Sequence, residues 1–309
     1  SASATLLRFR LRANNRARVA EGVMPHIAAR DGTRLYYEEA GVGTPVIFIH
    51  EYAGDYRTWE MQMRYFSRAH RCVTYSQRGY PPSDVPEDGA KYSQDIARDD
   101  VIAVMDALKI EKAHIVGHSM GALTALHVGI RYPKRCISVT AAGCGYGSSA
   151  DPKKVEEMRA VSREIGKAFA AEGMAVVSAR YADSPQRQPH KNKDPRGYAE
   201  FARMLGEHSA TGHALTMINL QAERPTLQDM EPDLKKFSVP LLIIVGDEDD
   251  WALDGSVFLK RTVPTAGLLV IPRSGHTLVP EEPMALNAAL ADLFAAAEAG
   301  RWLAHKIPK

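Results

Sequence analysis

Short apolar segments recur along most of the chain and are separated by longer stretches with helical periodicity. Residues 34–40 alternate between apolar and polar side chains, and residues 45–50 form a continuous apolar run. Further short runs rich in β-branched residues lie at 71–76, 112–117, 136–143, 240–246 and 267–273. Continuous runs of this length are typical of strands that are buried on both faces of a parallel sheet.

The intervening stretches are predicted to be helices. In residues 93–110, one face carries the apolar side chains of Ala97, Val101, Val104, Met105 and Leu108. Ser93 is positioned to cap this helix. Residues 122–133 and 284–302 show similar helical patterns. Strands that alternate with helices predict an α/β fold with a mostly parallel central sheet flanked by helices.

The alternation stops after about residue 148. Between residues 152 and 234 there is no convincing strand pattern, and the sheet is expected to resume at residue 240. We therefore predict a core made of residues 23–148 and 236–309, with a helical cap at 149–235 inserted before the last two strands. Three prolines and several cations between 183 and 197 predict a solvated loop that carries Arg187, Lys191, Lys193 and Arg196.

Composition excludes several classes of protein. Residues 1–22 carry five arginines before the first acidic residue and are interpreted as a flexible basic extension. The formal net charge of +2 gives no argument for a nucleic-acid partner, and no window approaches the ~18 apolar residues of a membrane span. The three cysteines favour reduced, buried thiols and a cytoplasmic location. The oligomeric state is left open, with a homodimer as one option.

One turn between a predicted strand and a predicted helix carries candidate chemistry. Ser119 lies between Gly117 and Gly121, in the sequence G-H-S-M-G. A turn this tight imposes unusual backbone angles on its central residue, so small neighbours are needed. The following helix offers backbone N–H groups and a positive dipole to an oxyanion. Ser119 is therefore a candidate nucleophile.

A serine nucleophile needs a base and a group that orients the base. His276 follows the predicted strand at 267–273, and four acids, Asp247, Glu248, Asp249 and Asp250, follow the strand at 240–246. If all these strands are parallel, both loops leave the sheet at the same edge as Ser119. The order Ser, Asp, His along the chain is that of serine hydrolases built on such a sheet.

With these motifs the sequence resembles the α/β-hydrolase superfamily of the capped type, over roughly residues 24 to 309. The resemblance implies Asp249, three residues after the glycine of its loop, as the triad acid. It also implies an oxyanion hole formed by the backbone N–H groups of Tyr52 and Met120. The family usually has glycine at the position of Glu51. This carboxylate either opposes a developing anion or points away from it and leaves the Tyr52 N–H intact; we favour the second alternative.

The resemblance implies a cofactor-free carboxylesterase that acts on a small-molecule, ester-like substrate through an acyl-enzyme intermediate. Glu51, His118 and Trp251 are candidate pocket residues. No metal site is expected, because the histidines lack the spacing of a zinc hydrolase. Serine at the elbow argues against epoxide hydrolases and haloalkane dehalogenases, which would carry aspartate. A hydrolase of carbon–carbon bonds in ring-cleavage products, a cofactor-free perhydrolase, and a ligand-binding receptor on a hydrolase scaffold remain alternatives.

Overall fold

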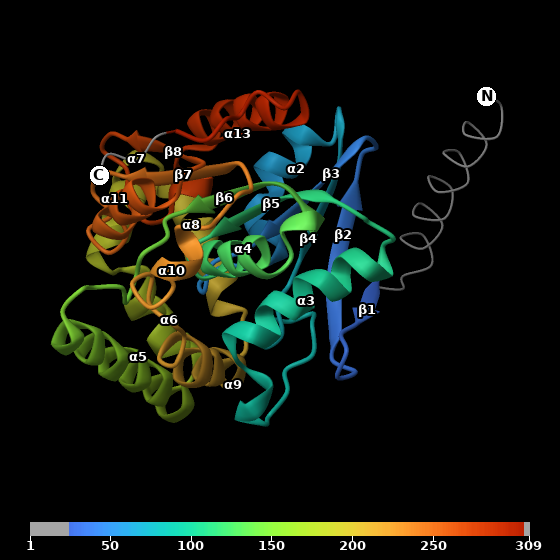
Figure 1. Ribbon diagram of the computed structural model, residues 1–309. Coiled ribbons are helices and arrows are strands. Elements are labelled where there is room, and N and C mark those ends of the chain that lie inside the picture. The colour runs from blue at the N-terminus through green and yellow to red at the C-terminus, as the bar shows by residue number, and fades with distance from the viewer. Residues whose placement is uncertain (1–24, 306–309) are drawn as a thin grey trace.

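The computed structural model describes residues 25–305, which form an eight-stranded sheet flanked by helices (Figure 1). The basic extension predicted for residues 1–22 lies outside the described residues. The strand order is β1-β2-β4-β3-β5-β6-β7-β8. The strands are β1 (His26–Ala28), β2 (Arg34–Ala40), β3 (Thr44–Ile49), β4 (His70–Tyr75), β5 (Ala113–His118), β6 (Cys136–Ala142), β7 (Leu241–Gly246) and β8 (Ala266–Ile271).

The sheet is mostly parallel, as predicted. Strand β2 pairs antiparallel with β1 and with β4. All the remaining neighbouring pairs, from β4 through β3, β5, β6 and β7 to β8, are parallel. The carboxyl ends of β3, β5, β7 and β8 therefore meet at one edge. The loops that carry Glu51, Ser119, Asp249 and His276 all leave the sheet at this edge.

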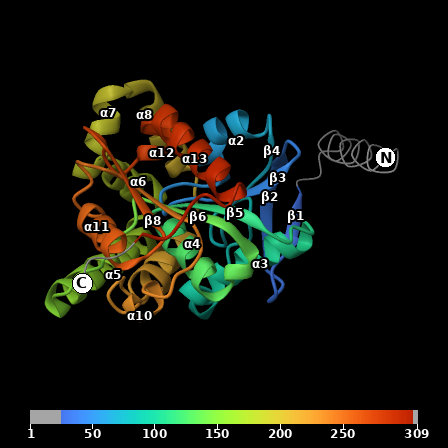
Figure 2. The ribbon, with the colours of Figure 1, turned by 45° about the horizontal axis from the view of Figure 1, so that its top comes forward.

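The two faces of the sheet bury separate sets of apolar side chains. Ile47 and Ile49 of β3 belong to one core cluster, whereas Val46 and Phe48 belong to the other. This alternation follows from the two-residue period of a strand, and it explains why β3 is apolar throughout. Helices α3 (Gln94–Ala107), α4 (Met120–Arg131) and α11 (Leu253–Thr262) cover the first cluster, and α2 (Glu60–Phe66) and α13 (Pro283–Glu298) cover the second. Figure 1 and the turned view in Figure 2 show helices on both sides of the sheet.

The helices of the core lie close to their predicted positions. Ser93 caps α3, since its hydroxyl accepts a hydrogen bond from the Ile96 N–H at 3.2 Å. The three cysteines are buried and free, as predicted. The core helices are α2 (Glu60–Phe66), α3 (Gln94–Ala107), α4 (Met120–Arg131), α11 (Leu253–Thr262), α12 (Leu278–Glu281) and α13 (Pro283–Glu298), with the 3₁₀ turns η1 (Tyr56–Trp59), η2 (Gly89–Lys91) and η3 (Pro133–Arg135).

A helical insertion, which we define as residues 152–234, joins β6 to β7, as the break in the pattern predicted. It contains α5 (Pro152–Glu172), α6 (Met174–Ala182), η4 (Pro185–Arg187), α7 (Gln188–Lys193), α8 (Pro195–Gly206), α9 (Ala210–Leu215), the π-helical η5 (Thr216–Gln221) and α10 (Glu231–Leu234). The prediction of an open loop at 183–197 is wrong. Its prolines occupy the first turns of η4, α7 and α8, where a missing N–H costs no hydrogen bond.

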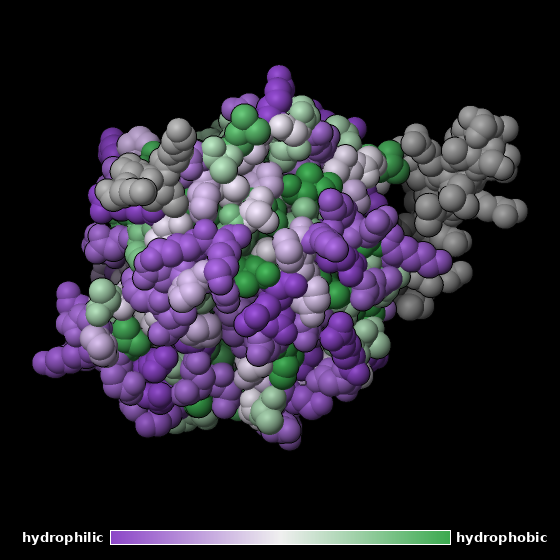
Figure 3. Space-filling view, viewed as in Figure 1, coloured by the Kyte–Doolittle hydropathy of each residue, from purple (hydrophilic) through white to green (hydrophobic). Residues whose placement is uncertain are grey.

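Hydrophilic side chains cover most of the face shown in Figure 3, and apolar side chains appear there only in small, scattered patches. Among residues 25–305, no helix combines the length and the hydropathy that crossing a bilayer requires.

Candidate active site

Ser119 lies at the sharp turn between β5 and α4. Its φ of 52° and ψ of −111° fall in a region that side-chain-bearing residues rarely adopt. A hydrogen bond of 2.7 Å from the Ser119 N–H to the Ala142 carbonyl holds this conformation. A Cβ atom on Gly117 would lie 2.1 Å from the Gly121 carbonyl oxygen, and one on Gly121 would lie 2.3 Å from the Ile49 oxygen. The turn thus requires both glycines, which explains the G-x-S-x-G spacing.

Ser119, His276 and Asp249 form a continuous hydrogen-bonded chain. The His276 Nε2 atom lies 2.8 Å from the Ser119 Oγ, and its Nδ1 atom lies 2.7 Å from the Asp249 Oδ2. The Nδ1–H donates to the Asp249 carboxylate, so Nε2 is left to accept a hydrogen bond from the serine hydroxyl. Of the four acids in the loop after β7, only Asp249 is buried; Asp247, Glu248 and Asp250 are exposed.

The surroundings of His276 favour its protonated form. Burial alone would lower the pKa of His276, but the charge and hydrogen bond of Asp249 outweigh burial and raise it above its ordinary value. The His276 backbone is also fixed, because its N–H donates to the Gln186 carbonyl at 2.8 Å and its carbonyl accepts from the His118 Nε2 at 2.7 Å. His118 is fully buried, and burial lowers its pKa to about 4, so it is neutral at pH 7. It therefore supports the histidine loop from behind.

The backbone N–H groups of Tyr52 and Met120 are available at the same edge of the sheet. Met120 is the first residue of α4, so its N–H has no acceptor within the helix. Within residues 25–305, neither N–H donates to a protein acceptor. The Tyr52 ring packs into the helical insertion, where its hydroxyl donates to the His213 carbonyl at 3.0 Å.

Glu51 forms a buried ion pair with Arg187 of the insertion. The Arg187 Nη2 and Nη1 atoms lie 2.6 and 3.1 Å from the two carboxylate oxygens, and both side chains are at least 98% buried. Burial alone would raise the pKa of Glu51, but the charge of Arg187 holds it below its ordinary value. The carboxylate is therefore ionised and neutralised by Arg187. The prediction that Arg187 lies on a solvated loop is wrong.

A second cation of the insertion also contacts the core. Lys193 lies 2.9 Å from Glu281 and 2.5 Å from Glu282, next to the loop that carries His276. Lys191, in contrast, pairs with Asp183 at the surface. These cations lie close together in the sequence, but they have different partners: Lys193 contacts acids of the core, whereas Lys191 contacts an acid at the surface.

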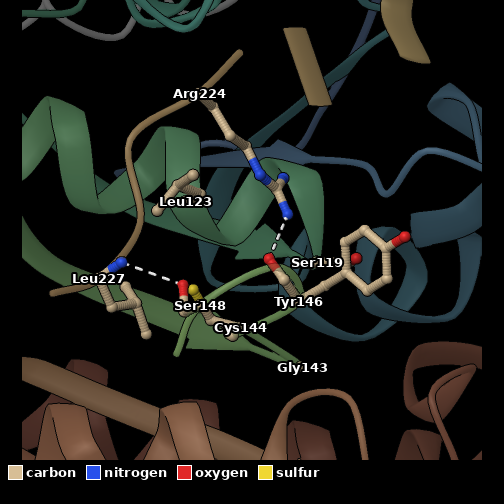
Figure 4. A pocket seen from close by; sticks show the side chains of 9 residues that line it. Ser119, Leu123, Gly143, Cys144, Tyr146, Ser148, Arg224 and Leu227 are labelled. Atoms are coloured by element: carbon tan, nitrogen blue, oxygen red, sulfur yellow. Dashed lines mark hydrogen bonds between the residues drawn. The ribbon is translucent and has the colours of Figure 1, made fainter. Parts of the chain in front are cut away.

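A narrow pocket of about 10 Å³, room for about one water molecule, opens at Ser119 (Figure 4). Its walls come from the end of β6, from α4 and from the segment that returns from the insertion, and its lining residues are Ser119, Leu123, Gly143, Cys144, Gly145, Tyr146, Ser148, Arg224 and Leu227. Glu51 and His118 are not among these residues. Trp251 lies beside the pocket, where its ring contacts Tyr146 at 5.4 Å and His276 at 5.9 Å between centroids.

The sequence did not single out Arg224, although it lines this pocket. It follows η5 in the stretch Q-A-E-R-P-T, which matches no catalytic motif. Its position at the pocket depends on how the insertion returns to the core, and no local signal reports that path. Among residues 25–305, no group of three or more histidine, cysteine or acidic side chains has the arrangement of a metal site.

Comparison with known proteins agrees with the fold. A family model described as alpha/beta hydrolase fold matches residues 44–283. The chain belongs to this family. It is 28% identical to the AB hydrolase superfamily protein YisY of Bacillus subtilis, over 86% of this chain and 97% of that protein. It is 32% identical to 3-oxoadipate enol-lactonase 1 of Acinetobacter baylyi, over 66% of this chain and 71% of that protein.

Solved structures show the same fold. A thermophilic esterase from Thermogutta terrifontis, in a malate-bound structure, superposes with a TM-score of 0.79 at 22% identity, over 89% of this chain and 98% of that one. The enol-lactonase from Burkholderia xenovorans superposes with a TM-score of 0.76 at 22% identity, over 88% of this chain and all of that one. These likenesses show that the chain has the alpha/beta hydrolase fold.

Proposed function

We propose that this hydrolase cleaves carboxylic esters of small molecules through an acyl-enzyme intermediate on Ser119. The observation that carries the proposal is the hydrogen-bonded chain from Ser119 through His276 to Asp249, with both hydrogen bonds at 2.8 Å or less. A nucleophile, a base within hydrogen-bond reach and a group that orients the base are the components that acyl transfer requires.

In the first half of the reaction, His276 Nε2 takes the proton of the Ser119 hydroxyl as Oγ attacks the ester carbonyl. The Tyr52 and Met120 N–H groups donate to the oxyanion, each contributing about 3 kcal/mol of transition-state stabilisation. Asp249 holds the imidazole in the required tautomer and stabilises its charged form. The C–O bond to the leaving group then breaks, and His276 delivers its proton to the departing alcohol.

In the second half, a water molecule replaces the alcohol and His276 takes its proton. The resulting hydroxide attacks the acyl carbonyl, the bond to Oγ breaks, and Ser119 regains its proton from His276. The carboxylic acid is released. All proton transfers use His276 Nε2, so the reaction needs no cofactor beyond these side chains.

We further propose that the insertion acts as a cap over this site. Its residues Arg187 and Gln186 contact the loops of Glu51 and His276, and Arg224 reaches the pocket at Ser119. Substrate size and shape would then be selected by the insertion, within the predicted boundaries of 149–235.

Lactones are cyclic esters and follow the same chemistry, and enol-lactonases are among the similar proteins. Epoxide hydrolases are also similar in sequence, including one from Caballeronia sordidicola, but the serine at the elbow favours ester chemistry. Carbon–carbon bond hydrolysis and perhydrolysis remain alternatives, and a screen that includes ring-cleavage products and peroxide-dependent halogenation separates them.

A receptor-like role is the alternative from another class. The feature in the sequence that favoured it was Glu51, and the ion pair with Arg187 supports the enzyme instead because it neutralises that carboxylate. Many substrate equivalents consumed per protein molecule would exclude this alternative.

Reaction with a fluorophosphonate probe, followed by peptide mass spectrometry, tests the proposal. We expect one adduct on Ser119 that is lost in His276→Ala, and turnover of p-nitrophenyl butyrate that is lost in Ser119→Ala. Unchanged turnover in Ser119→Ala would refute the assignment of the nucleophile.

A further inference from the structure

Arg224 is a buried cation beside the candidate nucleophile. Its side chain extends past Leu123 toward Ser119 and Tyr146 in the pocket (Figure 4). The residue is 9% exposed, and it is the sole charged side chain among the residues that line this pocket.

The guanidinium is incompletely satisfied by the protein. Its Nη2 atom donates to the Tyr146 carbonyl at 2.8 Å, whereas Nη1 is buried and has no hydrogen-bond partner among the described residues. A buried donor without a partner is costly, and a buried charge without a counter-charge is more so. Such an arrangement is typical of a site that a ligand completes.

No carboxylate of the described chain compensates Arg224. The neighbouring Glu223 is exposed and pairs with Arg163 at 2.9 Å. Glu51 is taken by Arg187, and Asp249 by His276. The adjacent acid in the sequence and the two buried acids of the candidate site are therefore engaged elsewhere, and none of the ionisable groups that act on Arg224 is an acid of the Asp or Glu type.

The ionisable groups that do act on Arg224 are the Cys144 thiol and the phenols of Tyr146 and Tyr181. Burial raises the pKa of Cys144 to about 12, and burial is also the main cause that raises the pKa of Tyr181 to about 12. Both groups are neutral at pH 7 and bring no negative charge to the pocket. Burial lowers the pKa of the Arg224 guanidinium, but an arginine side chain remains protonated in proteins.

We propose that Arg224 binds a carboxylate on the substrate, so that the preferred substrates are esters or lactones that carry a second, ionised carboxyl group. The planar guanidinium fork matches a carboxylate, and the absence of a second cation from the pocket lining suits a group with one negative charge. This inference rests on the ester hydrolysis proposed above, and it assigns the substrate class of that same site.

The test compares half-esters of dicarboxylic acids with a neutral ester. Hydrolysis of monomethyl succinate, glutarate and adipate is followed by pH-stat at pH 7.5 and compared with that of methyl butanoate. For the wild-type protein we expect the best half-ester to exceed methyl butanoate at least tenfold in kcat/KM. Three chain lengths are used so that one places its carboxylate at Arg224.

The decisive variant is Arg224→Met, which keeps an unbranched side chain that can fill most of the same space and removes the guanidinium with its charge. It is expected to lower kcat/KM for that half-ester roughly 10- to 100-fold and to change that for methyl butanoate less than about threefold. Arg180→Met removes an arginine of the same insertion that is 59% exposed and pairs with Glu172, and it serves as the control for general electrostatic attraction. It is expected to leave the ratio between the two substrates unchanged.

Equal loss on both substrates in Arg224→Met would show that Arg224 only supports the Tyr146 carbonyl, and would overturn the inference. If the wild-type protein preferred none of the half-esters over methyl butanoate, the inference about Arg224 would also be overturned. Turnover of methyl butanoate and labelling of Ser119 would in that case still support the proposed hydrolase function. If the protein neither labels at Ser119 nor cleaves any ester, the proposed function fails and the inference with it.

A measurement on the wild-type protein covers the case in which Arg224→Met does not fold. Glutarate is expected to inhibit the hydrolysis of p-nitrophenyl butyrate competitively, at a concentration at least tenfold lower than its neutral analogue glutaramide. Equal inhibition by the two compounds would contradict recognition of a carboxylate.

Discussion

Replacing Arg187 with methionine should destabilise the protein strongly, because it leaves the Glu51 carboxylate buried without its counter-charge. The arginine is fully buried and the glutamate is 1% exposed, so water cannot take the place of the lost partner. Removing one member of a buried ion pair costs about 3–5 kcal/mol. For a chain of this size, 1 kcal/mol corresponds to about 2–3 °C in Tm, so a loss of roughly 6–15 °C is expected at pH 8.

The size of this loss should depend on pH. In the wild-type protein the pKa of Glu51 is held below its unfolded value, so the stability that the ion pair contributes is fully present above the unfolded pKa and is lost only as pH falls through the lower, folded pKa. Between pH 5 and 8 the pair therefore contributes a constant amount. Without Arg187, burial raises the pKa of Glu51, so the variant regains stability as pH falls and the carboxyl group takes up a proton.

Thermal unfolding followed by circular dichroism at pH 5 and pH 8 measures both effects. The double variant Glu51→Leu with Arg187→Met replaces the pair by apolar groups and should recover much of the loss. Arg180→Met, which removes the arginine of the exposed ion pair with Glu172, should change Tm little. A Tm of Arg187→Met within about 2 °C of the wild-type value at pH 8, or a double variant no more stable than the single one, would refute this account of Glu51.

Two further predictions concern the candidate active site. The pKa of His276 is raised and the base must be neutral to act, so the acidic limb of the kcat/KM profile should lie above about pH 6.5. Asp249→Asn should move this limb to lower pH and lower kcat about 10⁴-fold. A pH profile with p-nitrophenyl butyrate in which the limb stays in place would contradict the role of Asp249. Gly121→Ala should lower the hydrolysis of p-nitrophenyl butyrate by at least about 10²-fold, because the added Cβ would lie 2.3 Å from the Ile49 oxygen. The control Gly206→Ala should retain full activity, because its Cβ would meet no atom closer than 3.8 Å.

The sequence predicted the architecture well because the pattern is local. The alternation of Val46 and Phe48 with Ile47 and Ile49 follows directly from strand geometry, and β7 divides its apolar side chains between the two clusters in the same way. The short edge strand β1 carries too few residues for a pattern to be recognised. The serine turn was also predictable, since its glycines are required by contacts within a few residues and with the adjacent strand.

The features that were mispredicted or missed depend on partners far along the chain. Arg187 resembled a solvated cation because its partner, Glu51, is 136 residues away. Glu51 raised a question about the oxyanion hole, and the sequence could not identify the arginine that neutralises it. Of the four acids at 247–250, Asp249 is the buried one that reaches His276. Its burial depends on the tertiary structure and cannot be predicted from the neighbouring sequence. Arg224 belongs to no motif at all.

The contacts of η4 couple the position of the insertion to the orientation of His276, the proposed general base. The Gln186 carbonyl accepts the His276 N–H, and the next residue, Arg187, neutralises Glu51 and reaches Thr277 at 3.3 Å. Any movement that lifted this segment from the core would release the histidine loop and expose the Glu51 charge at the same time. A form of the molecule with η4 lifted would therefore lack an oriented general base, and substrate binding and base orientation would be completed in the same closing step.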